Sequence, residues 1–286
     1  MGPFPLSVKT TLKRAAAKLR EAGVESPSLC AQVLLAHVLG TDRLELIIRP
    51  DKTLSFQAAA RFDALIAERG RNTPVAYLTG KKEFFGLELF VDRDVLVPRP
   101  ETEGIVEEVL RIFPDQGQGF VFADICTGSG ALAVALCSLF PNSLGIAVDI
   151  SRSALGVAEK NARKHGVARR LHLACSDLGS GLASRSFDLV VANPPYVSAR
   201  EYAALPQEIR AFEPARALWA GEDGLRFYPG LASDCARVLK PGGTALVETG
   251  SSQGAEVLAC FREFPRTRII KDLAGLDRIV AADLVG

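Results

Sequence analysis

The sequence predicts an α/β protein in which a doubly wound sheet, with helices on both faces, follows a small helical domain. From Phe120 onward, apolar strand-like segments alternate with helical segments. This alternation is typical of a parallel sheet covered on both faces. Residues 7–72 show helical periodicity only. The length of 286 residues suits a core of about 200 residues joined to a smaller domain.

The composition is that of an ordinary globular protein, with 48% apolar and 23% charged residues. The formal net charge of +1 provides no global field for nucleic acid, so stable nucleic-acid binding is not expected. None of the six cysteines has C-x-x-C spacing and the three histidines lack zinc spacing, so a metal site is not expected either. Without a signal-peptide pattern or a membrane-length apolar run, we expect a cytoplasmic protein that does not bind membranes, and a monomer.

The predicted N-terminal domain, residues 1–72, consists of helices. Ser7 precedes the first, Ser26-Pro27 is an N-cap and first-turn pair for a second that ends at Gly40, and a third covers roughly 54–69. This segment carries 11 basic and seven acidic residues. A surface that docks the substrate and a merely solvated bundle face both fit that charge.

A β-hairpin linker is predicted over residues 73–98, because apolar residues alternate on both sides of Asp92-Arg93-Asp94. The catalytic domain is predicted from Arg99 to the end of the chain, starting with a helix from Glu101 to about Ile112. Its expected elements follow in order. Strands are expected at 120–125, 144–150, 170–177, 187–192 and 244–250. Helices are expected at 131–140, 151–166, 223–243 and 251–264. Two closing strands, which can form an antiparallel hairpin, are expected near 267–271 and 277–282.

A glycine-rich turn lies between the first strand of this domain and the next helix. It consists of Asp124, Ile125, Cys126, Thr127, Gly128, Ser129 and Gly130. Glycines in such a turn let the backbone approach a ligand. A dinucleotide site needs G-x-G-x-x-G and a pyrophosphate at the helix start, whereas Asp124 would repel a pyrophosphate and suit an ammonium group. The turn therefore favours S-adenosylmethionine over NAD.

Further acidic residues end the next two strands. Asp149 is placed to accept hydrogen bonds from both ribose hydroxyls of a nucleoside. Asp177 is placed to bind an adenine amino group, and Leu178 to pack on the ring. Each signal is weak alone, but successive strand ends meet at the edge where open α/β sheets bind ligands.

The segment Asn193-Pro194-Pro195-Tyr196 ends the fourth strand and suggests catalysis. An amide or aromatic amino nitrogen is a poor nucleophile because its lone pair is delocalised. The Asn193 side-chain oxygen and the Pro194 carbonyl can accept its two N–H bonds, while the prolines fix the turn. Tyr196 can pack on the planar target group and face a sulfonium methyl.

With these motifs, the sequence resembles the release factor glutamine N5-methyltransferases over nearly its whole length. The shared motifs are PVAYLTGKKEFFG, VLVPRPETE, DICTGSGALAVAL, AVDIS, NPPYV, FEPARAL with GEDGL, and LAGLDRIV. The resemblance implies a class I S-adenosylmethionine methyltransferase fold with a seven-stranded sheet. It also implies methylation of the glutamine in the Gly-Gly-Gln loop of peptide chain release factors, with residues 126–130, Asp149, Asp177 and Leu178 at the cofactor.

By the same resemblance, residues 193–196 hold the glutamine, and Phe84, Arg99 and Glu101 lie near the substrate mouth. One departure is Cys126, which stands where the family usually has glycine; we expect it to fit with a negative φ.

Three alternatives remain beside this interpretation. A nucleic-acid amino-methyltransferase also uses Asn-Pro-Pro-Tyr, but it needs a basic groove that the near-neutral charge disfavours. The related enzyme that methylates a ribosomal-protein glutamine normally carries Arg-Ser-Pro in place of Pro98-Arg99-Pro100. A noncatalytic cofactor-binding regulator would not need an intact Asn193 loop.

Overall fold

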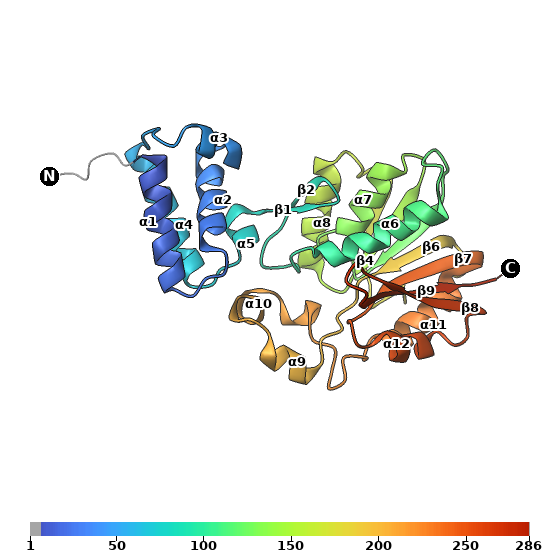
Figure 1. Cartoon of the computed structure of the whole chain (residues 1–286). Coiled ribbons are helices and arrows are strands. Elements are labelled where there is room, and N and C mark those ends of the chain that lie inside the picture. Colours follow the sequence, from blue (N-terminus) through green and yellow to red (C-terminus); the bar gives the residue numbers. More distant parts are fainter. Residues whose placement is uncertain (1–6, 286) are drawn as a thin grey trace. The chain divides into compact units, whose positions relative to one another are not determined.

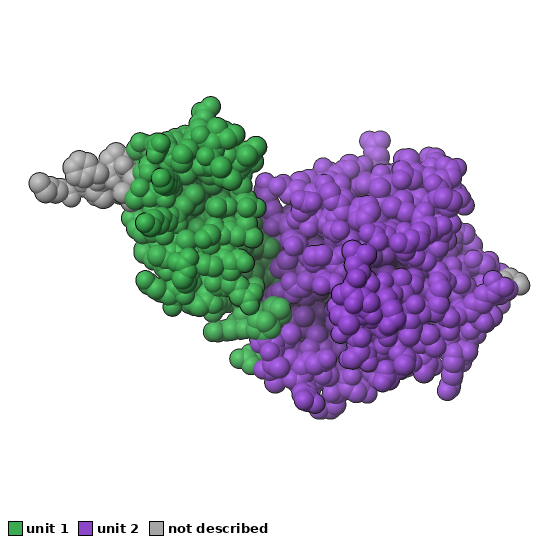
Figure 2. Space-filling model, viewed as in Figure 1, with its two compact units in different colours: residues 1–80, 206–212 green, residues 81–205, 213–286 purple. Residues whose placement is uncertain are grey.

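The computed structural model describes residues 7–285 and divides into two compact units (Figures 1 and 2). Unit 1 comprises the chain up to Gly80 together with Pro206–Phe212, and unit 2 comprises Lys81–Leu205 and the chain from Glu213. The helical unit therefore runs eight residues further than the 1–72 segment and recruits a distant piece of chain.

Unit 1 is a bundle of helices around one apolar core, in which Leu19, Leu34, Leu35 and Phe62 are fully buried. Its helices are α1 Val8–Glu21, α2 Pro27–Leu39, α3 Arg43–Ile48, α4 Phe56–Gly70, α5 Val75–Thr79 and α10 Gln207–Phe212. The buried Arg69 pairs with Glu208 at 2.7 Å and so holds α10 in the unit.

The helix starts of unit 1 agree only in part with the prediction. Ser7, which was expected to precede the first helix, is the N-cap of α1, because its Oγ accepts a hydrogen bond from the Thr10 N–H at 3.3 Å. Ser26 adopts a left-handed φ of 48°, and α2 begins at Pro27 with no side-chain cap from the described part of the chain. The predicted positions are therefore confirmed, with Ser26 at the N-cap and Pro27 in the first turn, but Ser26 occupies the N-cap without a capping side-chain hydrogen bond.

Unit 2 begins with a hairpin of β1 Lys81–Phe84 and β2 Leu87–Phe90. Its turn is at Phe85 and Gly86, both with positive φ, and not at 92–94 as the sequence predicted. Val91, Val95 and Val97 are buried without belonging to a strand. The apolar residues at 91, 95 and 97 alternate with polar ones because they are buried in an irregular segment, and they do not pair as strands.

The sheet of unit 2 has seven strands in the order β5-β4-β3-β6-β7-β9-β8. The first five in this order are parallel, and β9 runs antiparallel to both of its neighbours. The predicted doubly wound sheet with an antiparallel edge is confirmed. The strands are β3 Val121–Ile125, β4 Leu144–Asp149, β5 Leu171–Cys175, β6 Phe187–Ala192, β7 Leu239–Glu248, β8 Arg266–Lys271 and β9 Asp277–Asp283.

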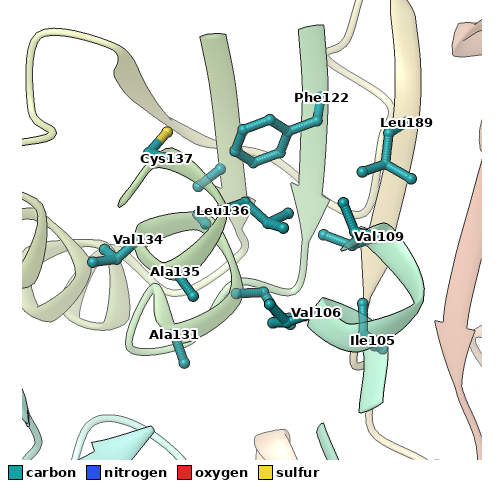
Figure 3. Close-up of a cluster of buried hydrophobic side chains, with 14 of the residues drawn as sticks. Ile105, Val106, Val109, Phe122, Ala131, Val134, Ala135, Leu136, Cys137 and Leu189 are labelled. Atoms are coloured by element: carbon teal, nitrogen blue, oxygen red, sulfur yellow. The ribbon is translucent and has the colours of Figure 1, made fainter. Parts of the chain in front are cut away.

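Two hydrophobic clusters cover the two faces of this sheet. In β6, Leu189 and Val191 belong to one cluster while Val190 and Ala192 belong to the other, as the twofold period of a strand requires. Figure 3 shows side chains of α6 and α7 gathered against Phe122 of β3 and against Leu189. The helical elements of unit 2 are η1 Pro100–Thr102, α6 Glu103–Ile112, α7 Ala131–Leu139, α8 Arg152–Lys164, α9 Ala199–Ala204, η2 Ala215–Ala217, α11 Tyr228–Val238 and α12 Gly254–Cys260.

Helices α11 and α12 pack on the second face, where Tyr228, Leu231 and Phe261 are fully buried. Across residues 7–285, no helix is both long and apolar enough to cross a membrane.

Candidate active site

A cavity of about 420 Å³ lies in unit 2, beside the carboxyl ends of β3, β4, β5 and β6. Here β3 has β4 on one side and β6 on the other, which is where open α/β sheets form a ligand crevice. The volume is in the usual range for small-molecule sites, about 300–1,000 Å³. The predicted residues that line it are Asp124, Cys126, Thr127, Gly128, Ser129, Asp149, Asp177, Leu178, Asn193 and Pro195.

Asp124, at the end of β3, is 1% exposed. Its Oδ2 accepts hydrogen bonds from the Thr127 hydroxyl and from the Ala133 N–H, whereas its Oδ1 has no hydrogen-bond partner in the described structure. Burial raises the pKa of Asp124 to about 7. A buried carboxylate oxygen without a donor is costly, so this atom suits a cationic ligand such as the ammonium group of S-adenosylmethionine.

The turn after β3 has three residues with positive φ: Cys126 at 64°, Gly128 at 54° and Gly130 at 79°. The expectation of a negative φ for Cys126 is therefore wrong. The turn has a left-handed backbone conformation at this position, and the cysteine adopts it although it carries a Cβ. Burial raises the pKa of the Cys126 thiol, which stays neutral.

Gly130 contributes to packing instead of lining the cavity. A Cβ on Gly130 would lie 3.1 Å from Ala158 Cβ and 3.2 Å from Ala158 Cα, so the glycine lets α7 start close against α8. This is the close helix approach that the last glycine of such turns permits.

Asp149 ends β4 and holds the turn from the other side. Its Oδ2 accepts a hydrogen bond from the Gly128 N–H at 2.9 Å, and its Oδ1 accepts one from the Ser151 N–H at 2.8 Å. Burial raises the pKa of Asp149, while these N–H donors and the nearby Arg216 counteract the rise. Each carboxylate oxygen still has a lone pair, so both ribose hydroxyls of a nucleoside can donate to it.

Asp177 and Leu178 follow β5 and line the same cavity, Leu178 with a positive φ of 48°. Ile150, which directly follows Asp149, also lines it and is 61% exposed. An exposed apolar side chain at a cavity wall can cover a flat ring. Ile150 was not among the site residues predicted from the sequence. The signal was available, since Ile150 directly follows the predicted ribose ligand.

The Asn193 side chain lines the cavity from the end of β6, and its Nδ2 donates to the Thr102 hydroxyl oxygen at 3.0 Å. Pro195 lines the cavity as well, whereas Pro194 is buried beside it. The Tyr196 hydroxyl donates to Glu248 Oε1 at 3.3 Å, and its ring borders the apolar core. Contact of Tyr196 with a target group stays a prediction.

The three residues expected near the substrate mouth are not among the described residues that line the cavity. Phe84 is 1% exposed and belongs to the hydrophobic core, so its side chain is not available to a substrate. Arg99 pairs with the buried Glu213 at 2.6 Å, and the other oxygen of Glu213 accepts from the Val97 N–H at 3.1 Å. Glu101 is exposed on η1.

A cationic and aromatic rim, which we define as Arg216, Trp219, Arg226 and Phe227, lines the same cavity and was not predicted. The Arg226 guanidinium carbon lies 5.9 Å from the Trp219 ring centroid and 5.6 Å from that of Phe227. Arginine over an aromatic face is a favourable contact, so the rim is a packed wall of the cavity.

Solved structures share the architecture. A methyltransferase from Pyrococcus furiosus matches 78% of this chain and 98% of its own with a TM-score of 0.52 and 16% sequence identity. A 16S rRNA methyltransferase of T. thermophilus, solved with AdoMet and guanosine, matches 71% of this chain and 49% of its own with a TM-score of 0.50 and 17% identity. At such low identities these matches show the fold alone.

Sequence comparison identifies the family. Residues 10–80 match the model of the PrmC N-terminal domain, and residues 108–216 match that of the methyltransferase small domain. The release factor glutamine methyltransferase of Nitratidesulfovibrio vulgaris is 39% identical over 276 residues, which cover 95% of this chain and 93% of the relative. That of Caulobacter vibrioides is 40% identical over 265 residues, covering 92% and 91%. This chain belongs to the family of release factor glutamine methyltransferases.

Proposed function

We propose that this protein transfers the methyl group of S-adenosylmethionine to the side-chain amide nitrogen of the glutamine in the Gly-Gly-Gln motif of peptide chain release factors. One observation carries the proposal. The Asn193 side chain lies in the same cavity as Asp124 and Asp149, and its Nδ2 is already bound to Thr102. Its Oδ1 is thus left to accept a hydrogen bond from an amide in that cavity.

The cavity residues fit the cofactor group by group. Among residues 7–285 no group donates to Asp124 Oδ1, which therefore suits the ammonium, and each oxygen of Asp149 has a further lone pair for a ribose hydroxyl. Asp177 and Leu178 are available to the adenine. When bound, the cofactor supplies a methyl group on a positively charged sulfur.

Residues of the Asn193 loop prepare the amide for attack. The Asn193 Oδ1 and the Pro194 carbonyl each accept one N–H of the glutamine amide, which fixes the nitrogen, pulls it toward a tetrahedral geometry and so draws its lone pair out of conjugation with the amide carbonyl. Catalysis then rests on positioning and electrostatics. As its bond to the methyl carbon forms and the bond from that carbon to sulfur breaks, the nitrogen would become acidic and lose one N–H proton to water, so no strong base is needed before transfer. A substrate without the N–H pair would leave two acceptors unpaired, at roughly 1–3 kcal/mol each.

Unit 1 is the proposed docking part for the release factor. It matches the PrmC N-terminal domain and carries exposed apolar side chains on α3 and at the start of α4. These are Leu44, Ile47, Ile48 and Phe56, which are 61%, 63%, 62% and 78% exposed. Because release factors act at the ribosome, we also place the reaction in the cytoplasm, and we propose that the enzyme works as a monomer.

Mass spectrometry tests the function directly. We expect one added methyl on the Gly-Gly-Gln glutamine of a release factor incubated with enzyme and cofactor, and none on a release factor with that glutamine changed to asparagine. A large-subunit ribosomal protein and an adenine-containing oligonucleotide are parallel substrates. Methylation of either one in place of the release factor would refute the proposal.

A further inference from the structure

The cationic and aromatic rim has no role in the proposed transfer, although it lines the cavity together with the proposed cofactor ligands. Its Trp219 is 40% exposed. Tryptophan side chains are highly buried on average, and the walls of small-molecule sites consist largely of apolar and aromatic side chains. A tryptophan left this open in a cavity wall is therefore a surface that a bound ligand can cover.

The backbone holds Trp219 beside the loop after β6. Val197 directly follows the Asn-Pro-Pro-Tyr segment, and its N–H donates to the Leu218 carbonyl oxygen at 2.8 Å. The Ala220 N–H donates to the Val197 carbonyl oxygen at 2.9 Å, so the residues on both sides of Trp219 are bound to Val197. Main-chain hydrogen bonds therefore set the position of Trp219, independently of what its side chain contacts.

The other end of the rim lies by Leu178, which was predicted to pack on the adenine. Phe227 of the rim is the N-cap residue of α11. In the first turn of that helix, a Cβ added to Gly230 would lie 3.2 Å from Leu178 Cδ1, so the start of α11 packs closely against Leu178. The rim therefore extends from the proposed adenine end of the cavity to the loop after β6.

Arg226 joins the two aromatic rings of the rim. Its guanidinium carbon lies 5.9 Å from the Trp219 ring centroid and 5.6 Å from that of Phe227. Among residues 7–285 no carboxylate forms an ion pair with Arg226, so no anionic partner draws it away from the rings. A guanidinium over an indole favours one orientation of the ring. An indole has two faces, and one covered by Arg226 leaves the second for a flat ligand.

We propose that Trp219 is a further cofactor-binding residue, which covers the nucleoside part of S-adenosylmethionine, and that Arg226 is a positioning residue, which holds the indole. Asp124 and Asp149 suit the polar groups of the cofactor, whereas a flat adenine ring binds best to an apolar or aromatic face. The inference goes beyond the proposed function because it concerns the cofactor alone and holds for any methyl acceptor. Contact of Trp219 with the methyl acceptor is the competing assignment, and the tests separate the two.

Trp219 is the only tryptophan of the chain, so the tryptophan fluorescence of the wild type reports on this position alone. We expect S-adenosylhomocysteine to quench the emission, with a midpoint at the dissociation constant measured by calorimetry. A Gly-Gly-Gln peptide without cofactor should leave the emission unchanged. An emission that does not respond to S-adenosylhomocysteine would overturn the proposal, and a response to the peptide alone would assign Trp219 to the methyl acceptor instead.

Calorimetry on variants measures what the ring contributes. Trp219→Ala should bind S-adenosylhomocysteine about 5–100-fold more weakly, and Trp219→Phe, which keeps a ring, within about 3-fold of the wild type. 5′-Methylthioadenosine keeps the nucleoside and lacks the amino acid part, so Trp219→Ala should lose the same factor for it. Phe56→Ala, at an exposed aromatic residue of unit 1, is the control and should bind both normally. Unchanged affinity in Trp219→Ala, or a loss confined to S-adenosylhomocysteine, would refute the nucleoside contact.

Fluorescence anisotropy of Trp219 without any ligand tests the positioning role of Arg226. Anisotropy should fall in Arg226→Ala, because the indole gains freedom, and should be largely restored in Arg226→Lys, which keeps a cation. Arg169→Ala, at an exposed arginine that does not line the cavity, should match the wild type. Equal anisotropy in Arg226→Ala and the wild type would exclude the positioning. None of these measurements uses a release factor, so a failure to methylate one would leave their outcome unaffected.

Discussion

The Gly128 N–H donates to Asp149 Oδ2 at 2.9 Å, so the glycine-rich turn after β3 is tied directly to the end of β4. Asp149, the residue proposed to bind ribose, thus also supports the turn proposed to contact the cofactor. The same oxygen can accept a further hydrogen bond, since a carboxylate has about four acceptor positions. Changes at Asp149 therefore act on the ligand and on the turn together.

Asp149→Ala should weaken cofactor binding, because both ribose hydroxyls lose their acceptor. Loss of hydrogen bonds to a charged group costs about 1.5–3 kcal/mol, which corresponds to roughly 10–100-fold in the dissociation constant measured by calorimetry. Asp115→Ala, at an exposed residue after α6, is the control and should bind normally. An unchanged dissociation constant in Asp149→Ala would remove the ribose assignment.

Asn193→Ala should separate binding from chemistry. Cofactor affinity should stay within about 3-fold, while methyl transfer to the release factor should fall at least about 10²–10³-fold, as for the loss of a group that stabilises the transition state. Single-turnover transfer with a radiolabelled cofactor measures the chemical step itself. Full transfer in this variant would contradict the role of the loop.

Cys126→Gly should stabilise the protein, because a left-handed φ of 64° is unfavourable for a residue with a Cβ. The expected gain is about 1 kcal/mol in the free energy of unfolding, measured by chemical denaturation. Cys126→Ala is the matched control, since alanine keeps the Cβ and should bring no such gain. If alanine stabilised as much as glycine, backbone strain would not be the cause.

Glu248→Gln should change how stability depends on pH. Its folded pKa of about 7 lies above the ordinary value of 4.5, so the stabilising contribution is complete below about 4.5 and is lost as the pH rises through 7. The variant should therefore gain stability over the wild type between pH 5 and pH 8, by on the order of 3 kcal/mol at most. Denaturation curves at the two pH values check this, and an equal difference at both would show that Glu248 is ionised throughout.

Exposed apolar residues of unit 1 provide the test of docking. Ile48→Ser and Phe56→Ser should raise KM for a whole release factor by about 10-fold if these side chains are buried by the partner. A short Gly-Gly-Gln peptide, which lacks the rest of the release factor, is the control substrate, and both variants should methylate it as the wild type does. Leu273→Ser, at a fully exposed residue of unit 2, should have no effect. Unchanged KM in both unit 1 variants would exclude these side chains from the docking surface.

The sheet and its ligand-binding edge could be predicted, because both follow from patterns of residues close together in the sequence. The strand–helix alternation after Phe120, with Asp124, Asp149 and Asn193 at strand ends, indicated both the sheet and its ligand edge. Parallel strands present their carboxyl ends at one edge, so the position of a residue in sequence gives its position in the fold. The cavity lining confirmed this placement for most of the residues selected.

Other features depended on contacts between distant segments. Phe84 has the same apolar character whether it faces a substrate or a core, and only packing put it into the core. The turn of the hairpin at Phe85 and Gly86 was missed because burial of Val91 and Val95 imitates strand alternation.

By itself, the sequence determined the fold class and the kind of cofactor and pointed to the loop proposed to bind the amide, because each follows from residues close together along the chain. Only the tertiary structure decided the left-handed conformation of Cys126, the rim around Trp219 and the hydrogen bond from Asn193 to Thr102. These depend on which segments meet across the sheet. The burial of apolar surface and the formation of buried hydrogen bonds decide which segments pack together, and no local sequence pattern encodes that packing.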